Sequence, residues 1–433
     1  MDRRTFLQAV AGGAGALYGS RGHGQERSAP TPPVPTPPVP AKPVLSVPLT
    51  HSDWMLKPNI PWGFEGVRHM LDACKACGWS HVYWRALDAG RATYASKLLA
   101  RGLEPEADNF FNPQTDADRQ LKRKFFPGQT PEQEKSILAK QSAMDYATFD
   151  SLAAAVDYGH KIGLKVHAWA SINEDDHGWG WPSEFTKRHP EFRWRRRDGR
   201  TYHSQLSFAF EEVRQYKLGI IDELLAYPID GLFLDWIRTG DVRDNPQTDP
   251  QGVADSGYET PLVERFKAQF GLDPHDLPNG DDRWVRTRAE PQTVFMRGVR
   301  DKARAKGIPV AAMVGHPWHY RGLLDKIDGS LRGLLLEVAT WAKEGLVDAV
   351  VAAGYYRDGG TPEKAYAALK EETGGKVDVW TYAWVPRTVA EFARDYDLAK
   401  RLAAPRVLLW EADYIDDRPD AGDLKAAMSA AAE

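Results

Sequence analysis

Residues 229–236 read IDGLFLDW, a short apolar run that ends in an acidic and an aromatic residue. The run lacks the alternation of polar and apolar residues that a strand with one face in water would show. A near-continuous apolar run of this length is typical of a strand buried on both faces, as in a parallel sheet covered by helices. We therefore predict a buried parallel strand over residues 229–236.

Similar runs recur along the chain on both sides of this one. They lie at residues 45–50, 80–86, 164–170, 308–314, 348–355, 377–383 and 406–411. Between them, apolar residues follow helical spacing, as in Phe149, Leu152 and Val156. Eight strands in strict alternation with helices predict an α/β fold, a closed (β/α)8 TIM barrel. An open doubly wound sheet is the alternative, but it normally carries a glycine-rich phosphate turn after its first strand, and the sequence has none.

The chain is longer than the roughly 250 residues that a barrel of this kind usually needs. The excess falls in three segments, 87–146, 171–207 and 237–290, which follow the second, third and fourth predicted strands. Barrel enzymes build their active sites from the loops at this end of the strands. We therefore expect the long βα loops after strands 2, 3 and 4 to be functional.

Composition excludes several classes of protein. The 433 residues are 42% hydrophobic and include 15 Trp, which excludes intrinsic disorder for most of the chain. A formal net charge of −4, with only a short basic run at 193–200, argues against nucleic-acid binding. No apolar run is long enough to span a membrane, and no cofactor is expected. Cys74 and Cys77 lie in a predicted helix over 64–77, where small core residues are the favoured interpretation.

The N-terminus predicts an export signal and a spacer. Arg3 and Arg4 precede a weakly apolar stretch rich in Ala and Gly, a pattern typical of a twin-arginine signal. Residues 30–43 contain eight prolines, which favour an extended polyproline II spacer. The expected organisation is a signal peptide over 1–29, a Pro-rich linker over 30–43 and a single barrel over 44–433. The expected location is periplasmic or extracellular.

Polar and aromatic side chains gather where the predicted strands end. Asp235 ends the fourth strand and Glu411 the eighth, and a charged carboxylate at such a position must be solvated, paired or functional. A structural ion pair between Asp235 and Arg238 is the alternative for the first. The other candidate substrate-binding residues at strand ends are Arg85, Asp88, His167, Trp169, Asn173, Asp175, Arg238, His316, Trp318, Tyr355, Tyr382, Trp384 and Asp413.

This combination of residue types points to sugar chemistry. Aromatic faces stack on sugar rings, and carboxylates and Arg bind hydroxyl groups. A pair of carboxylates is the usual machinery of glycosidic bond hydrolysis, because one protonates the leaving oxygen and the other attacks or activates water. Two alternatives remain at this point. One is a noncatalytic carbohydrate-binding barrel, and the other is a metal-dependent hydrolase that uses His167, His316, His319 and Asp235.

The stretch DGLFLDW (230–236) resembles the DGxDxDWE motif of chitinase-type barrels, although Phe233 and Ile237 replace two of its acids. A closer resemblance, over most of 44–415, is to exported bacterial glycosyl-hydrolase-like barrels of the family-10-like group. The segments that carry it are VYWRALDAGRATYASKLL (82–99), GLKVHAWASINED (163–175), HPEFRWRRRDGR (189–200), DGLFLDWIR (230–238), VDAVVAAGYYRDGG (347–360) and VDVWTYAW (377–384).

The resemblance implies a TIM barrel with carbohydrate-directed activity. It also implies that Asp235 is the leading catalytic carboxylate and that Arg238 keeps it ionised. We therefore expect an exported glycoside hydrolase that acts on a poly- or oligosaccharide, with no bound metal. Asp235 is the expected nucleophile or charge stabiliser, and Glu411 the expected general acid/base. Asp175, Asp358 and Asp413 are the reserve candidates for the second carboxylate.

Overall fold

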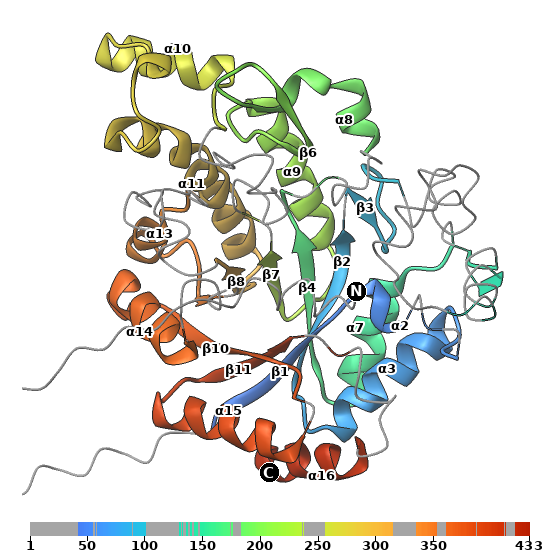
Figure 1. Cartoon of the computed structure of the whole chain (residues 1–433). Helices are drawn as coiled ribbons and strands as arrows, with labels where there is room; N and C mark the ends of the chain where they lie inside the picture. The colour runs from blue at the N-terminus through green and yellow to red at the C-terminus, as the bar shows by residue number, and fades with distance from the viewer. Residues whose placement is uncertain are drawn as a thin grey trace, which may run out of the picture.

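A computed structural model gives the fold of the chain (Figure 1). It describes residues 42–54, 57, 59–88, 90–100, 130, 132, 136, 139–140, 143–145, 148–173, 175, 183–235, 237, 256–314, 335–352, 361–386, 388–410, 412 and 421–433. Within this part of the chain, no helix is long and apolar enough to cross a membrane.

Eight parallel strands form a closed barrel. In chain order they are β1 (Val44–Leu49), β2 (His81–Asp88), β4 (Lys165–Ser171), β7 (Gly231–Asp235), β8 (Val310–Met313), β9 (Ala349–Val351), β10 (Asp378–Trp384) and β11 (Arg406–Trp410). Each pairs with the next in parallel register, and β1 pairs with both β2 and β11, which closes the sheet. The predicted (β/α)8 barrel is confirmed, with all eight strands at the predicted places.

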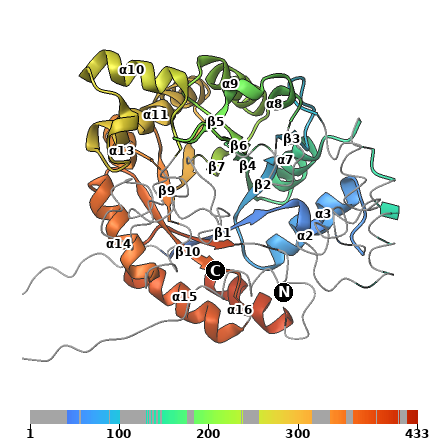
Figure 2. The same cartoon turned by 45° about the horizontal axis from the view of Figure 1, so that its top comes forward.

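One helix from each βα unit covers the outside of the barrel (Figures 1 and 2). These helices are α3 (Phe64–Ala76), α7 (Ser151–Lys161), α9 (Glu211–Leu224), α11 (Asp282–Ala305), α13 (Val338–Glu344), α14 (Pro362–Thr373), α15 (Val389–Arg401) and α16 (Ala421–Ala432). Their buried faces join the strands in one continuous hydrophobic core. Cys74 and Cys77 both lie in that core as free thiols, as predicted.

Local sequence signals explain where the helices begin. The side chain of Asp150 accepts a hydrogen bond from the backbone N–H of Ala153 at 2.9 Å, which caps α7. Thr388 caps α15 in the same way, at 3.1 Å from the N–H of Glu391. Such caps satisfy N–H groups that have no partner within the helix. They fix the points at which the chain turns from a strand end into the outer layer.

The long βα segments contain structure of their own. The segment after β2 carries the short strand β3 (Arg91–Ala92), and the segment after β4 carries α8 (Glu184–Arg188), η1 (Pro190–Phe192) and the hairpin β5 (Arg193–Arg195) and β6 (Thr201–Leu206). The segment after β7 contains α10 (Thr260–Phe270) and η3 (Pro274–Asp276). Near β1 lies the short helix α2 (His51–Trp54). Tyr258, Leu262, Phe266 and Trp284 form a second, smaller core in the segment after β7.

Helix α11 continues through Pro291, where the helical hydrogen-bond ladder should be interrupted. Proline has no N–H, so the carbonyl of Thr287, four residues earlier, loses its helical partner. The Arg265 guanidinium from α10 donates to that carbonyl at 2.6 Å. The extra element after β7 therefore supplies the hydrogen bond that Pro291 removes, which fixes α10 against α11.

Candidate active site at the barrel mouth

Ring contacts across the barrel show which side chains point inward. Phe233 on β7 lies 4.5 Å from Tyr83 on β2 and 6.2 Å from Trp169 on β4, measured between ring centroids. Successive residues of a strand point to opposite faces, so the residues two further along the same strands also point inward. Ser171 and Asp235 are those residues, and their Cα atoms are partners in the β4–β7 register. Both lie at the C-terminal ends of their strands, where the barrel opens.

Four aromatic side chains line this end of the barrel. Trp169 packs edge-on against Trp410 at 5.1 Å, and Trp410 lies 6.1 Å from Tyr382. Tyr382 in turn packs edge-on against Trp384 at 5.8 Å. The ring of Trp169 is buried, whereas Trp384 keeps 44% of its surface exposed. The four residues form a wall, called here the aromatic wall, that runs from the barrel interior to its rim.

A charged pair lies beside the aromatic wall. The Arg85 guanidinium stacks over the Trp169 ring at 4.4 Å from its centroid and donates to the Ser171 hydroxyl at 2.7 Å. The same nitrogen forms an ion pair with Asp88. Arg85 is buried and Asp88 nearly so, and a buried ion pair needs such additional hydrogen bonds to offset the loss of hydration. This group places one positive and one negative charge at the mouth of the barrel.

Asp235 is the last residue of β7, and its side chain points into the barrel. Only 1% of its surface is exposed, and its backbone carbonyl accepts a hydrogen bond from the N–H of Ile172 at 2.9 Å. This bond continues the β4–β7 ladder to the rim and fixes the backbone of the residue. Asn173, two residues beyond Ser171, is equally buried. Asp235 and the Arg85–Asp88 pair thus lie at the C-terminal ends of β7 and β2, where the barrel opens.

Solved structures with the same architecture include several glycosidases. The PgaB (BpsB) glycoside hydrolase domain from Bordetella bronchiseptica matches 90% of this chain and 99% of its own, with a TM-score of 0.56 and 13% identity. The β-amylase catalytic domain from Paenibacillus polymyxa matches 92% of this chain and 100% of its own, with a TM-score of 0.56 and 10% identity. The likeness to both structures agrees with the (β/α)8 TIM barrel described above.

A further match is the α-L-fucosidase isoenzyme 2 from Paenibacillus thiaminolyticus, with a TM-score of 0.51 and 15% identity over 90% of this chain. Here the chain spans 49% of the length of the matched protein. Neither a protein family nor a curated protein matches the sequence. At 10–15% identity these likenesses establish the fold. They do not carry any catalytic residue over to this chain.

His167 does not belong to the mouth, and its predicted role in substrate binding is corrected here. It is the Cα partner of Gly231, the first residue of β7, so it lies in the lower layer of the barrel. Its ring packs against Tyr83 at 4.9 Å and His81 at 5.4 Å. Burial, reinforced by the positive charge of Arg406, holds the pKa of His167 well below its usual value. A neutral imidazole in this layer is a core residue.

Asp175 also departs from its expected place at the mouth. It is fully buried and forms an ion pair with Lys217 on α9 at 3.6 Å, where Lys217 is 1% exposed. Its carboxylate also accepts hydrogen bonds from the N–H of Ser183, at 3.2 Å, and from the hydroxyl of Thr186. Burial lowers the pKa of Lys217. These contacts join the loop after β4 to α8 and α9, which is a structural role.

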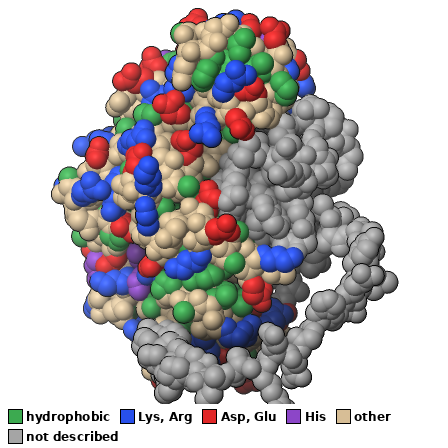
Figure 3. Space-filling model, turned by 90° about the vertical axis from the view of Figure 1, so that its left-hand side faces the viewer, with side chains coloured by type: hydrophobic (Ala, Val, Ile, Leu, Met, Phe, Trp, Pro, Cys, Tyr) green, Lys and Arg blue, Asp and Glu red, His purple; other side chains and the backbone are tan. Residues whose placement is uncertain are grey.

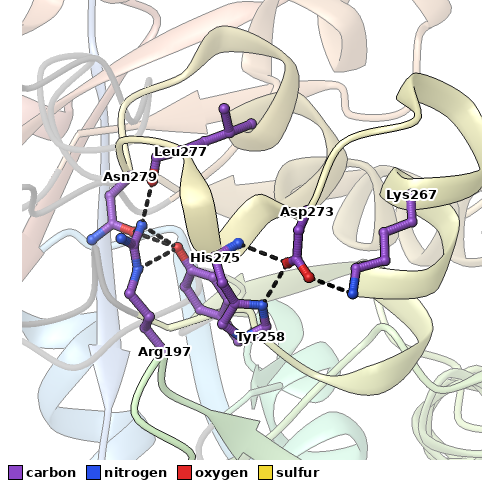
Figure 4. A network of polar contacts seen from close by, with 7 residues as sticks. All are labelled: Arg197, Tyr258, Lys267, Asp273, His275, Leu277 and Asn279. Atoms are coloured by element: carbon purple, nitrogen blue, oxygen red, sulfur yellow. Dashed lines mark hydrogen bonds and ion pairs between the residues drawn. The ribbon is translucent and has the colours of Figure 1, made fainter.

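The Arg-rich run at 193–200 is largely committed to structure. Arg197 donates to the Tyr258 hydroxyl at 2.9 and 2.6 Å and to Asn279 Oδ1 at 2.7 Å (Figure 4). Arg200 pairs with Asp198 at 2.6 Å. The Arg197 bonds hold the β5–β6 hairpin against the segment that contains α10, whereas the Arg200–Asp198 pair lies within the turn of the hairpin.

Glu259, at the start of α10, is a buried acid that no sequence motif marks. One of its oxygens accepts a hydrogen bond from the N–H of Arg195 at 2.8 Å, and burial raises the pKa of its carboxyl to about 7. A cavity beside it is lined by Trp194, Arg288 and Gln292 among others, and has room for about one water molecule. The cavity is too small for a sugar ring, so Glu259 is not assigned to the candidate active site.

Several predicted residues lie outside the described part of the chain. They are Glu411, Arg238, His316, Trp318, Tyr355 and Asp413, with the reserve candidate Asp358. Among the described residues, no cluster of three His, Cys, Asp or Glu side chains could hold a metal ion. Two residues of the mouth, Ser171 and Trp410, were not among the predicted candidates. The alternation of Arg406, Leu408 and Trp410 along β11 is the signal that could have placed Trp410 inside.

Proposed function

We propose that the chain is an exported glycoside hydrolase that cleaves a poly- or oligosaccharide at the mouth of the barrel. The observation that carries the proposal is the position of Asp235 at the C-terminal end of β7, in register with Ser171, which accepts a hydrogen bond from Arg85 of the Arg85–Asp88 pair. The aromatic wall lies at the same end of the barrel. Aromatic rings offer stacking faces for sugars, and a carboxylate beside them can act on the anomeric carbon. The glycosidase-like fold supports this assignment.

In this proposal Asp235 is the nucleophile or the charge stabiliser. The transition state of glycoside hydrolysis carries positive charge on the sugar ring, which an ionised carboxylate stabilises. Glu411 is proposed as the general acid/base because it directly follows Trp410, the last residue of β11. A protonated Glu411 would donate to the leaving oxygen and then activate water. Arg238 and Arg85 are the cations proposed to favour the ionised form of Asp235.

Replacement of Asp235 by Asn tests the proposal. The amide keeps the shape of the side chain but removes its charge, so turnover should fall by about 10³-fold or more. Sugar binding should largely remain, because the aromatic wall is unchanged. Hydrolysis of a glycan panel and the melting temperature should be measured on the same preparation. A lower melting temperature with normal activity per folded molecule would instead assign Asp235 a structural role.

Glu411→Gln provides the matched test for the second carboxylate. Its activity should fall steeply on natural glycosides but much less on aryl glycosides with good leaving groups, since these need little protonation. Equal losses on both substrates would exclude Glu411 as the general acid. If the wild-type protein binds glycans on an array but releases no product, the noncatalytic carbohydrate-binding barrel is the correct function.

A further inference from the structure

The β5–β6 hairpin and the residues that lead into α10 meet in a short stretch of backbone pairing, called here the junction. Arg196 and Ser256 form an isolated antiparallel bridge. The carbonyl of Arg195 accepts hydrogen bonds from the N–H groups of Gly257 and Tyr258, both at 3.0 Å. The hairpin belongs to the loop after β4, and its partner belongs to the loop after β7. The junction therefore joins two of the long βα loops.

Glu259 adds a side-chain bond to the junction. It is the N-cap residue of α10, yet its side chain caps no N–H group of that helix. Instead, Oε1 accepts a 2.8 Å hydrogen bond from the N–H of Arg195, and only 2% of the residue is exposed. Oε2 is also buried and has no hydrogen-bond partner within the described part of the chain. The junction thus encloses a carboxyl group that is only half satisfied.

The surroundings of Glu259 favour its neutral form. Burial raises the pKa of the carboxyl from 4.5 to about 7, although the bond from the Arg195 N–H and the positive charges of Arg288 and Arg195 oppose this shift. Arg288 on α11 donates to the carbonyls of Ser256 at 2.9 Å and Asn279 at 2.6 Å. Among the described residues that line the cavity beside Glu259, Arg288 is the other charged side chain.

The size of this cavity limits how the charged form can be stabilised. The cavity has room for about one water molecule. A neutral carboxyl needs one acceptor for its proton, and a single water can supply it. A carboxylate has about four acceptor sites, and one water with one backbone N–H satisfies only part of them. An ionised Glu259 is therefore fully hydrated only when the junction opens to solvent.

We propose that Glu259 is a proton-controlled latch between the loops after β4 and β7, whose neutral form holds the start of α10 on the hairpin and whose ionisation weakens the junction. The proposal is independent of the proposed glycosidase activity. Because the pKa is higher in the closed junction, the closed state binds more protons than the open state between pH 4.5 and pH 7. The latch is therefore strongest below pH 4.5 and weakens as the pH rises to about 7.

Hydrogen exchange on the full-length protein tests the latch. After correction for intrinsic exchange rates, the protection factors of the Arg195, Gly257 and Tyr258 amides should fall by at least about 10-fold between pH 5 and pH 8. Glu259→Gln keeps an acceptor for the Arg195 N–H but cannot ionise, so the decline should shrink to less than about twofold. Glu264→Gln, at an exposed position on α10, is the control substitution. An equal decline in the wild type and in Glu259→Gln would overturn the proposal.

A second measurement needs no variant. Carbon NMR of the wild-type protein, labelled at the glutamate side-chain carboxyl, follows the ionisation of these groups directly. We expect a glutamate resonance that titrates near pH 7, and Glu259→Gln should remove it. If no glutamate resonance titrates above pH 6, the carboxyl is already ionised in the closed junction, and the latch is excluded.

Discussion

Gly231 shows how one residue sets the lower layer of the barrel. A Cβ atom at this position would lie 2.3 Å from Nδ1 of His167 and 3.3 Å from the carbonyl oxygen of Pro309. Gly231→Ala should therefore lower the free energy of unfolding by about 1–3 kcal/mol, through displacement of the imidazole. Gly280→Ala is the control, because its Cβ would meet nothing within 4 Å. Urea unfolding of both variants tests the prediction, and equal stability of the two would contradict it.

His81, a partly buried residue at the start of β2, makes the stability of the fold sensitive to acid. Burial, with a contribution from Arg406, lowers the pKa of His81 to about 4, below the value of about 6.5 expected for the unfolded chain. Lys165 also disfavours the charged ring, and Asp230 opposes both cations. The unfolded chain therefore binds more protons between pH 6.5 and pH 4, so stability is lost as the pH falls through this range.

His81→Gln removes this titration. The loss of unfolding free energy between pH 7 and pH 5 should be smaller in the variant than in the wild type, by about 1 kcal/mol. His69→Gln, at an exposed position on α3, is the control substitution. Chemical denaturation at pH 7, 6 and 5 gives the comparison. A steeper decline in the His81 variant would show that its ring is charged in the folded protein.

At the scale of elements, Arg197 adds side-chain bonds between the β5–β6 hairpin and the segment after β7, beside the backbone bonds from the N–H groups of Gly257 and Tyr258 to the carbonyl of Arg195. Arg197 bonds to the Tyr258 hydroxyl, to Asn279 and, at 2.7 Å, to the carbonyl of Leu277 (Figure 4). Arg197→Met should expose the backbone amides of 256–281 to faster hydrogen exchange, by about 10-fold or more, with a smaller change in overall melting temperature. Arg200→Met, which removes an exposed pair, should leave these amides protected.

The strands were predictable because each carries its own signal. A parallel strand buried on both faces must be apolar along its whole length, and β7 and β11 therefore stand out in the sequence. The β5–β6 hairpin gave no such signal, because its sequence is rich in arginine and contains no continuous apolar run. Helix α11 begins at Asp282, inside the segment 237–290 that was expected to be a long loop, and its first turns are polar. The hydrogen bond that compensates for Pro291 comes from Arg265 on α10, a different helix, so the local sequence of α11 does not reveal it.

The candidate site was predictable in part, for a related reason. Asp235 ends a strand, and the C-terminal ends of parallel strands meet at one edge of a barrel, so sequence position alone brings it to the mouth. His167 was misplaced because it stands two residues earlier on its strand than Trp169, and period-2 alternation does not distinguish layers. Asp175 was misplaced because its partner Lys217 lies on a different helix, which only the tertiary structure brings close.

At the scale of the whole molecule, charges of both signs are interspersed over the face seen in Figure 3. Arg297 on α11 forms two 2.8 Å bonds with Glu344 of α13, and Arg300 bonds to Asp348 at 2.7 and 3.1 Å. Exposed pairs of this kind contribute little to stability but leave no strong field of one sign. The described residues of this face therefore show no large patch of a single charge.

The proposed export route depends on the N-terminus, which lies outside the described residues. Arg3 and Arg4 are the expected address of a twin-arginine signal, and a receptor that reads this pair should reject lysines. Replacement of both by Lys should leave the full-length protein in the cytoplasm, as shown by fractionation with antibody detection. Export of the variant at the wild-type level would exclude this route, while leaving the barrel and its candidate site unaffected.

The barrel closes through β1, and this determines where the chain can be shortened. Pro43 is buried, and its carbonyl accepts a 3.4 Å hydrogen bond from the Tyr396 hydroxyl, so the folded unit includes the last residue of the expected spacer. A chain that starts at Lys42 should keep the melting temperature and any activity of the longer protein, since polyproline II has no internal hydrogen bonds to lose. A stability loss above about 2 kcal/mol would mean that the spacer docks on the barrel.

A chain that starts at Thr50 is the matched comparison, because it lacks β1. Without this strand, β2 and β11 lose their shared partner, and both edges of an eight-stranded sheet are left open. Leu45, Val47 and Leu49, all buried, would be removed from the core. We expect this chain to aggregate or to unfold without a cooperative transition, measured by circular dichroism and size-exclusion chromatography. A cooperative, monomeric product would show that the barrel is stable without closure, and that β1 is dispensable to the fold.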